Sequence, residues 1–304
     1  MSRALKLDAE NPRPNPDRRG LRKGLYLIPS AFTAANIGMG FYAVMSALRG
    51  FQYVGTGVEE DLLRSAGYFD SAAKAIGWAV LFDMLDGRIA RMTKTTTEIG
   101  IQLDSIADVV TFGLAPAVLV YTWGYGASLP EGSELHRLAW FLSFMYLMCG
   151  AFRLARFNVQ ASRPRVLAEG AIKTDKKSFV GLPIPVAGGL IAALVHFAPI
   201  PLIAYGIERA EIYSALLMIL VGFLGVLMVS TLRFPSFKTV GTRSRSMRTI
   251  ILAVAVGMLI FLYSQYVLLA IVIAYILHGL LSRLISAFRR SPDVSEAKVE
   301  AKQV

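Results

Sequence analysis

The amino-acid sequence predicts an all-α integral membrane protein with about eight transmembrane helices. Of its 304 residues, 55% are hydrophobic and only 17% are charged, and the mean hydropathy is +0.52. Apolar runs long enough to cross a hydrocarbon core of about 30 Å recur along the whole chain. This composition argues against a water-soluble domain.

The expected spans are each roughly 16 to 25 residues long, as a bilayer requires. They cover residues 26–48, 68–87, 103–124, 137–154, 182–204, 211–232, 249–264 and 266–285. The last two are separated only by a few residues around Ser264 and Gln265, which predicts a tight helical hairpin. We expect a membrane domain at 25–288, a basic tail at 1–24 and a disordered polar tail at 289–304.

Charged residues in the gaps between these spans predict the orientation of the chain. The N-terminal tail and the gaps with Arg88 and Arg243 are basic, whereas the gaps with Glu59, Glu131 and Glu208 are acidic. Basic gaps face the cytoplasm in membrane proteins. We therefore expect both termini to be cytoplasmic in a multi-pass protein of the cell (inner) membrane. The same gaps account for the net charge of +11, so no nucleic-acid partner is expected.

Four aspartates lie near the cytoplasmic ends of the second and third expected spans. Asp83 and Asp86 are three residues apart, and Asp104 and Asp108 are four apart, so each pair projects from one face of a helix. The short polar connection at 92–99 lets the two helices lie antiparallel and bring the carboxylates together. Divalent ions would relieve their mutual repulsion, and such oxygen ligands suit Mg²⁺ or Mn²⁺. A pair of ions could clamp a diphosphate.

Two other interpretations of this region remain open from the residues alone. Acidic side chains inside a membrane also mark ion pathways, so a cation-coupled transporter is an alternative from a different class. Such a protein should show repeated halves and helices broken near the midplane, and the sequence shows no repeat. Gly87, Ala90 and Gly100 leave room for phosphates or a nucleotide beside the helices, or they serve close helix packing.

The complete spacing resembles the signature of the CDP-alcohol phosphotransferase family. It reads Asp83-x-x-Asp86-Gly87-x-x-Ala90-Arg91, then eight residues, then Gly100-x-x-x-Asp104-x-x-x-Asp108. The resemblance implies a six-helix core over about residues 26–232, to which the C-terminal helical pair is added, and a homodimer. It also implies two divalent ions bound by the four aspartates, with Asp108 as general base.

Within this family, further stretches look like the bacterial phosphatidylserine synthases. They are TAANIGMG at 33–40, VTFGLAP at 110–116, FRLARFN at 152–158 and FVGLPIP at 179–185. Asn36 suits a cytosine edge or a ribose, or a hydrogen bond between helices. Arg153 and Arg156 can face one way and hold a carboxylate or phosphate, or anchor the chain at the inner surface.

These resemblances lead to a specific hypothesis. The chain would transfer the phosphatidyl group of CDP-diacylglycerol directly to the hydroxyl of L-serine, giving phosphatidylserine and CMP. We expect the CDP-linked lipid to contact Asn36, Gly87, Ala90, Arg91 and Gly100. We expect the acceptor to contact Arg153, Arg156 and Asn158. Glycerol 3-phosphate is the alternative acceptor, because the same arginines suit a phosphate. His136, His196 and His278 lie away from the aspartates, and the hypothesis gives them no role.

Overall fold

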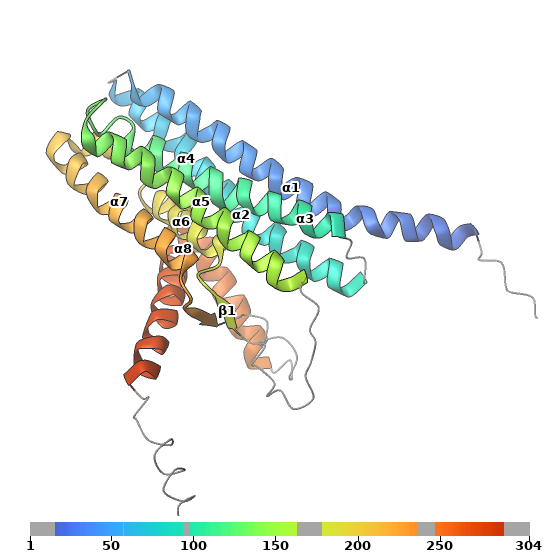
Figure 1. Ribbon diagram of the computed structural model, residues 1–304. Coiled ribbons are helices and arrows are strands. Elements are labelled where there is room, and N and C mark those ends of the chain that lie inside the picture. The colour runs from blue at the N-terminus through green and yellow to red at the C-terminus, as the bar shows by residue number, and fades with distance from the viewer. Residues whose placement is uncertain (1–15, 57, 94–97, 163–177, 236–246, 289–304) are drawn as a thin grey trace, which may run out of the picture.

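The computed structural model describes residues 16–56, 58–93, 98–162, 178–235 and 247–288. Most of these residues are helical, and the long helices run side by side as an elongated bundle (Figure 1). The bundle contains α1 (Pro16–Val54), α2 (Glu59–Thr93), α5 (Glu134–Ser162), α6 (Ile184–Phe197) and α7 (Ile207–Val229). The prediction of an all-α membrane protein is confirmed.

One further rod of the bundle is built from four consecutive helical segments. It begins with α3 (Glu98–Asp108) and continues through the π-helical turn η1 (Val109–Leu114), α4 (Ala115–Val120) and a second π-helical turn, η2 (Tyr121–Tyr125). A π-helical turn has hydrogen bonds between residues five apart, is wider than an α-helical turn, and is frequently found at functional sites. The rod contains the expected third span, but the sequence analysis did not predict its two wide turns.

Small side chains let α1 and α2 approach each other closely. Ala43 and Ala47 of α1 and Ala72 and Ala79 of α2 are fully buried in the main core. In membranes, small residues at helix interfaces allow backbones to pack tightly and add van der Waals contact. A polar contact joins the same pair of helices, because the Ser46 hydroxyl donates to a backbone carbonyl of α2 at 2.8 Å.

Five described helical segments are long and apolar enough to cross a membrane. They are Ala31–Val54, Ile99–Tyr125, Glu134–Gln160, Ile207–Val229 and Ala255–Ser282. The expected span 68–87 lies inside α2, which does not meet this standard, and the span at 182–204 contains the shorter apolar helix α6. The chain is therefore a multi-pass protein, with five of its spans supported by length and composition.

The C-terminal pair of expected spans corresponds to α8 (Met247–Phe288). Its backbone is non-helical at Tyr263, with φ −135° and ψ 45°. Two limbs diverge from a sharp bend in α8 (Figure 1). The bend lies within two residues of the position predicted for the hairpin.

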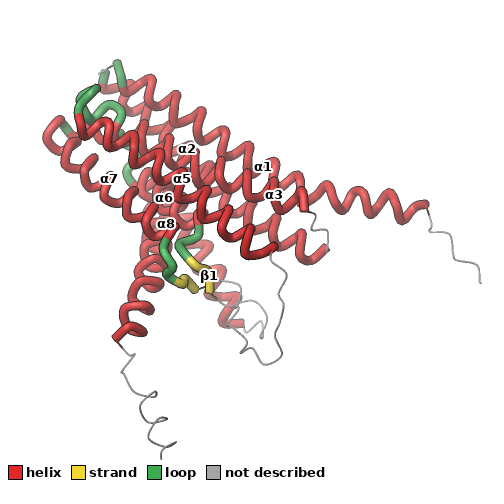
Figure 2. The backbone as a smooth tube through the Cα atoms, viewed as in Figure 1, coloured by secondary structure: helices red, strands yellow, loops and turns green. Residues whose placement is uncertain are grey.

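Two features differ from the expected organisation. α1 begins at Pro16, inside the segment expected to be a tail, because proline is well suited to the first turn of a helix. A short antiparallel strand pair, β1 (Ser178–Val180) with β2 (Arg233–Pro235), is also present (Figure 2). The predicted C-terminal tail at 289–304 lies outside the described residues.

Gly181 joins this strand pair to the bundle. Its backbone φ is +81°, its N–H donates to the Leu232 carbonyl at 2.7 Å, and the next N–H donates to the Leu227 carbonyl at 3.0 Å. A Cβ at position 181 would lie 2.3 Å from the Met228 carbonyl oxygen. Only glycine meets both conditions, so this residue fixes the start of α6 against the end of α7.

The first prediction concerns this connection. Gly181→Ala should destabilise the protein by more than about 1 kcal/mol, because the new side chain is strained and collides with backbone. Thermal unfolding in detergent measures the loss as a lower midpoint. Gly189→Ala is the matched control, since its Cβ would meet nothing within 4 Å. Equal midpoints for the two variants would contradict the prediction.

Candidate metal centre

Three of the four predicted aspartates come together in space. Carboxylate oxygens of Asp83, Asp104 and Asp108 all lie within 4.8 Å of one another, and all three residues are half-buried. Among the described residues, this is the one group of three or more acidic, histidine or cysteine side chains with a separation suited to a metal. The prediction that α2 and α3 join their carboxylates is confirmed for these three residues.

The helix arrangement explains this convergence. α1 packs against both α2 and α3, so it holds the two helices in place beside each other. The C-terminal end of α2, the start of α3 and the C-terminal end of α5 lie at one end of the bundle (Figure 1). Asp83 lies on α2. Asp104 and Asp108 lie one helical turn apart on α3, so both project from the same face of that helix.

The donor set fits a hard divalent cation. Two oxygen ligands of one Mg²⁺ lie at most about 4.2 Å apart, so the three carboxylates already have nearly the separation that a shared ion requires. Asp86 follows Asp83 on α2, but its side chain lies outside the described part of the structure, as do those of Ala90 and Arg91. The fourth ligand and these two lipid contacts remain predictions. The backbones of Gly87 and Gly100 are half-buried on the same two helices.

A π-helical turn begins directly after Asp108. In an α-helix the Phe112 carbonyl would accept a hydrogen bond from residue 116, but that residue is Pro116, which has no N–H. The buried Tyr146 hydroxyl donates to this carbonyl instead, at 3.0 Å. Gly188 of α6 leaves space here, because a Cβ would lie 3.0 Å from the same oxygen. Tyr146 thus supports the π-helical turn that follows Asp108, and the sequence analysis did not identify it.

Asn36 lies beside this turn with an unsatisfied side chain. The Thr111 hydroxyl donates to its backbone carbonyl at 3.0 Å, and Thr111 follows Asp108 by three residues. The side chain of Asn36 is 1% exposed, and neither Nδ2 nor Oδ1 has a hydrogen-bond partner among the described residues. A buried amide without partners costs free energy unless a ligand or water satisfies it. The Asn36 amide therefore has hydrogen-bonding capacity left for a ligand, and its contact with the CDP-linked lipid stays a prediction.

Arg153 is a buried positive charge near the carboxylates. It is 7% exposed, its Nε has no partner within the described part of the chain, and it interacts electrostatically with Asp108 and with Tyr275 of α8. A buried guanidinium usually needs an anion beside it. Arg153 can therefore supply a hydrogen-bond donor and a positive charge to a ligand at the metal centre.

The other two predicted acceptor residues have different surroundings. Asn158 Nδ2 donates to the Ser105 hydroxyl at 2.9 Å, so it links α5 to α3 between the two α3 aspartates. The Arg156 guanidinium instead donates to the Val229 and Ser230 carbonyls, at 3.1 and 3.3 Å. These contacts cap the C-terminal end of α7. The structure thus brings Arg153 and Asn158 to the α3 side and directs Arg156 towards α7.

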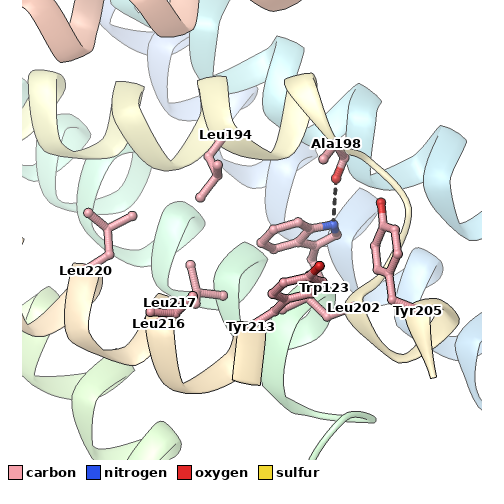
Figure 3. Close-up of a pocket in the computed structure, with 9 residues that line it drawn as sticks. All are labelled: Trp123, Leu194, Ala198, Leu202, Tyr205, Tyr213, Leu216, Leu217 and Leu220. Carbon is pink, nitrogen blue, oxygen red and sulfur yellow. Dashed lines mark hydrogen bonds between the residues drawn. The ribbon is translucent and has the colours of Figure 1, made fainter. Parts of the chain in front are cut away.

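An apolar cavity of about 360 Å³ lies elsewhere in the bundle (Figure 3). Its lining includes Leu194, Leu217 and Trp123, whose Nε1 donates to the Ala198 carbonyl at 3.1 Å. Trp123 is fifteen residues beyond Asp108 along one rod, which corresponds to about 22 Å of helix. Among the residues that the structure describes, no charged side chain lines the cavity, and its lining does not include the three aspartates.

The fold and the site define a multi-pass helical membrane protein that presents clustered carboxylates at one end of its helices. The sequence profile of the CDP-alcohol phosphatidyltransferases matches residues 26–279, and the chain belongs to this family. The match extends beyond the expected core at 26–232 and includes much of α8.

Named relatives show which members of the family the chain is similar to. It is 33% identical over 216 residues to the CDP-diacylglycerol–serine O-phosphatidyltransferase of Helicobacter pylori, which covers 71% of this chain and 75% of that protein. The enzyme of the same name from Bacillus subtilis is 33% identical over 168 residues, or 55% of this chain and 76% of that one. An archaetidylserine synthase of Methanothermobacter thermautotrophicus is 33% identical over 184 residues, with coverages of 59% and 64%.

The second prediction tests the carboxylate cluster as a metal site. Asp83→Asn should weaken Mn²⁺ binding by at least about tenfold. Removing a residue that only hydrogen-bonds to a metal ligand already lowers the metal affinity by about that factor. Titration of Mn²⁺ with the detergent-solubilised protein, followed by electron paramagnetic resonance, gives the dissociation constant.

The control is Asp61→Asn, which removes an acidic group from the first turn of α2, at the opposite end of that helix. Its Mn²⁺ affinity should equal that of the wild type. An unchanged affinity in Asp83→Asn would contradict the metal assignment.

Proposed function

We propose that this chain transfers the phosphatidyl group of CDP-diacylglycerol to the hydroxyl of L-serine, giving phosphatidylserine and CMP. The observation that carries the proposal is the convergence of Asp83, Asp104 and Asp108 beside the buried Arg153. The family membership supports a CDP-linked donor. The names of the relatives from Helicobacter pylori and Bacillus subtilis support serine as the acceptor.

The carboxylates form the part of the site that would bind the CDP-linked lipid. Bound divalent ions, Mg²⁺ or Mn²⁺ and two in number by the family resemblance, would neutralise the diphosphate and stabilise the departing CMP. Asp83, Asp86, Asp104 and Asp108 would hold them. Asn36 has both a donor and an acceptor for the nucleotide. Gly87, Ala90 and Arg91 of α2 and Gly100 of α3 would contact the same CDP-linked lipid. The acyl chains stay in the surrounding lipid.

The acceptor side depends on Asp108 and Arg153. Asp108 accepts the proton of the serine hydroxyl while the oxygen forms a bond to the phosphorus of the diacylglycerol phosphate. The bond from that phosphorus to the CMP oxygen breaks, and CMP leaves with the negative charge. Arg153 holds the serine carboxylate, and Asn158 keeps α5 in position against α3. This direct route needs no covalent enzyme intermediate.

The contacts of Arg156 favour serine over glycerol 3-phosphate. A dianionic phosphate needs more positive charge than the single carboxylate of a zwitterion. Arg156 donates to carbonyls at the end of α7, whereas the buried Arg153 interacts electrostatically with Asp108. One buried arginine matches one carboxylate. The family membership likewise favours a transferase over the cation-coupled transporter.

The third prediction identifies the acceptor. Purified protein supplied with CDP-diacylglycerol and Mg²⁺ or Mn²⁺ should release CMP with L-serine and not with glycerol 3-phosphate or inositol phosphate. Chromatography of the nucleotide products measures the rate. Release with glycerol 3-phosphate alone would contradict the serine assignment and leave the metal site and the family unaffected.

The fourth prediction concerns the proton acceptor. Asp108→Asn should lower the turnover rate by at least about 100-fold, because a general base contributes that much in the transition state. Its affinity for the CDP-linked lipid should change far less, because proton removal does not occur in the ground state.

The comparison variant for this test is Asp83→Asn, which should lose both metal affinity and turnover. Rates at saturating Mn²⁺ separate the two effects. A rate for Asp108→Asn within a few-fold of the wild type under these conditions would show that Asp108 is not the base.

The fifth prediction concerns orientation. We propose that both termini and the carboxylate end of the bundle face the cytoplasm in the inner membrane, because the basic gaps share that side. A single cysteine at position 59 in a Cys149→Ser background should react with an impermeant reagent from outside intact cells. A cysteine at position 94 should react only after lysis. The reverse pattern would contradict the orientation.

We also propose the homodimer that the family resemblance implies. It should appear as twice the 33.2 kDa chain mass in detergent by light scattering.

A further inference from the structure

A second group of reactive side chains lies apart from the carboxylate site. His196 of α6 is 6% exposed, and its Nδ1 is hydrogen-bonded to Asp70 of α2. Its Nε2 is 2.9 Å from the hydroxyl oxygen of Ser264 in α8. Lys74 pairs with the other oxygen of Asp70 at 2.7 Å. Serine, histidine and aspartate thus form one chain of hydrogen bonds across three helices.

This group is distant from the metal centre. Asp70 precedes Asp83 by thirteen residues on α2, which corresponds to about 20 Å along the helix. His196 is the penultimate residue of α6, at the opposite end from Gly181 and the carboxylates. The phosphatidyl transfer proposed above therefore does not use these residues.

The arrangement sets the chemistry of the imidazole. With its proton on Nδ1 bonded to the Asp70 carboxylate, neutral His196 has a free electron pair on Nε2 that accepts the Ser264 proton. A nucleophile within hydrogen-bond reach of a base, with the base oriented by a third group, is the signature of nucleophilic catalysis. Ionisable residues inside a membrane protein are costly, which favours a functional role.

The bend in α8 places backbone N–H groups near Ser264. Ser264 follows Tyr263, whose non-helical backbone interrupts the helix. The first N–H groups of the limb that starts there have no acceptor within that limb. Such N–H groups can stabilise the oxyanion of a tetrahedral intermediate. A serine at a sharp turn before a helix is also how the nucleophile is presented in α/β-hydrolases.

We propose that Asp70, His196 and Ser264 form a second catalytic site that hydrolyses an acyl ester of a membrane lipid. The surroundings indicate the substrate class, because the side chains next to Ser264 are exposed and mostly apolar. Phe261 is 83% exposed and Tyr266 is 63% exposed. In a membrane-spanning protein, such side chains contact lipid. Ser264 itself is half-buried, so a chain from the bilayer can reach it.

The reaction has two balanced steps. The Ser264 oxygen bonds to the ester carbonyl carbon as His196 Nε2 takes the hydroxyl proton. The bond from that carbon to the ester alkoxy oxygen breaks, and His196 returns the proton to the lysolipid that leaves. Water then attacks the acyl-serine, His196 takes the water proton, and the bond to Ser264 breaks. Ser264 regains its proton and a fatty acid leaves.

Labelling with a fluorophosphonate tests the nucleophile in the full chain, reconstituted in nanodiscs. Wild-type protein should be labelled at Ser264, as shown by peptide mass spectrometry, and Ser264→Ala should not be labelled. His196→Gln keeps a hydrogen-bonding group but removes the base, so its labelling rate should fall by at least about 100-fold. Asp108→Asn should be labelled like the wild type, which separates this site from the proposed transferase.

CMP release from Ser264→Ala, compared with that of the wild type, confirms that the variant is folded. Wild-type protein should also release labelled fatty acid from a diacyl phospholipid in the nanodisc, and Ser264→Ala should not. Absence of labelling in a wild-type protein that releases CMP would overturn the proposal and leave the three side chains as a hydrogen-bonded clamp between helices. Labelling without release of fatty acid would overturn the lipid-ester assignment.

Discussion

Mutual repulsion among carboxylates is the constraint on which the rest of this structure depends. Oxygens of Asp83, Asp104 and Asp108 lie within 4.8 Å of one another at one end of the bundle, where water screens charge less than it does in bulk solution. Such a cluster persists only when rigid helices hold it and positive charge offsets it. The close packing of α1 with α2 and α3 provides the first condition. The buried guanidinium of Arg153 provides part of the second. We propose that divalent ions held by the aspartates provide more of it.

The same constraint connects the metal centre to the substrate chemistry. In the proposed function, cations held by the carboxylate cluster would also bind the diphosphate, so donor recognition would follow from the family motif. Recognition of the acceptor would not, because we propose that it depends on side chains of α5. There Arg153 interacts electrostatically with Asp108, whereas Arg156 donates to carbonyls at the end of α7. We propose that the discrimination between a zwitterion and a phosphate depends on these different contacts of two arginines that are three residues apart.

The sequence predicted what local helical geometry determines. Spacings of three and four residues place the aspartates on shared helix faces, and the apolar runs located the long helices and the bend near Ser264. Contacts between distant segments could not be predicted in this way. The direction of Arg156 depends on where α7 ends, and the role of Tyr146 depends on Pro116 of another helix. The contacts of His196 could not be predicted either, because its partners, Asp70 and Ser264, are 126 and 68 residues away in the chain.

The central claim is that α2 and α3 together form a divalent metal site, and anomalous scattering from crystals containing Mn²⁺ tests it most directly. The account predicts anomalous density between these helices, about 2.0–2.2 Å from carboxylate oxygens of Asp83, Asp104 and Asp108. Density at Asp86 as well would complete the predicted ligand set. Protein that releases CMP in solution, but whose crystals at saturating Mn²⁺ show no anomalous density at these aspartates, would contradict the account.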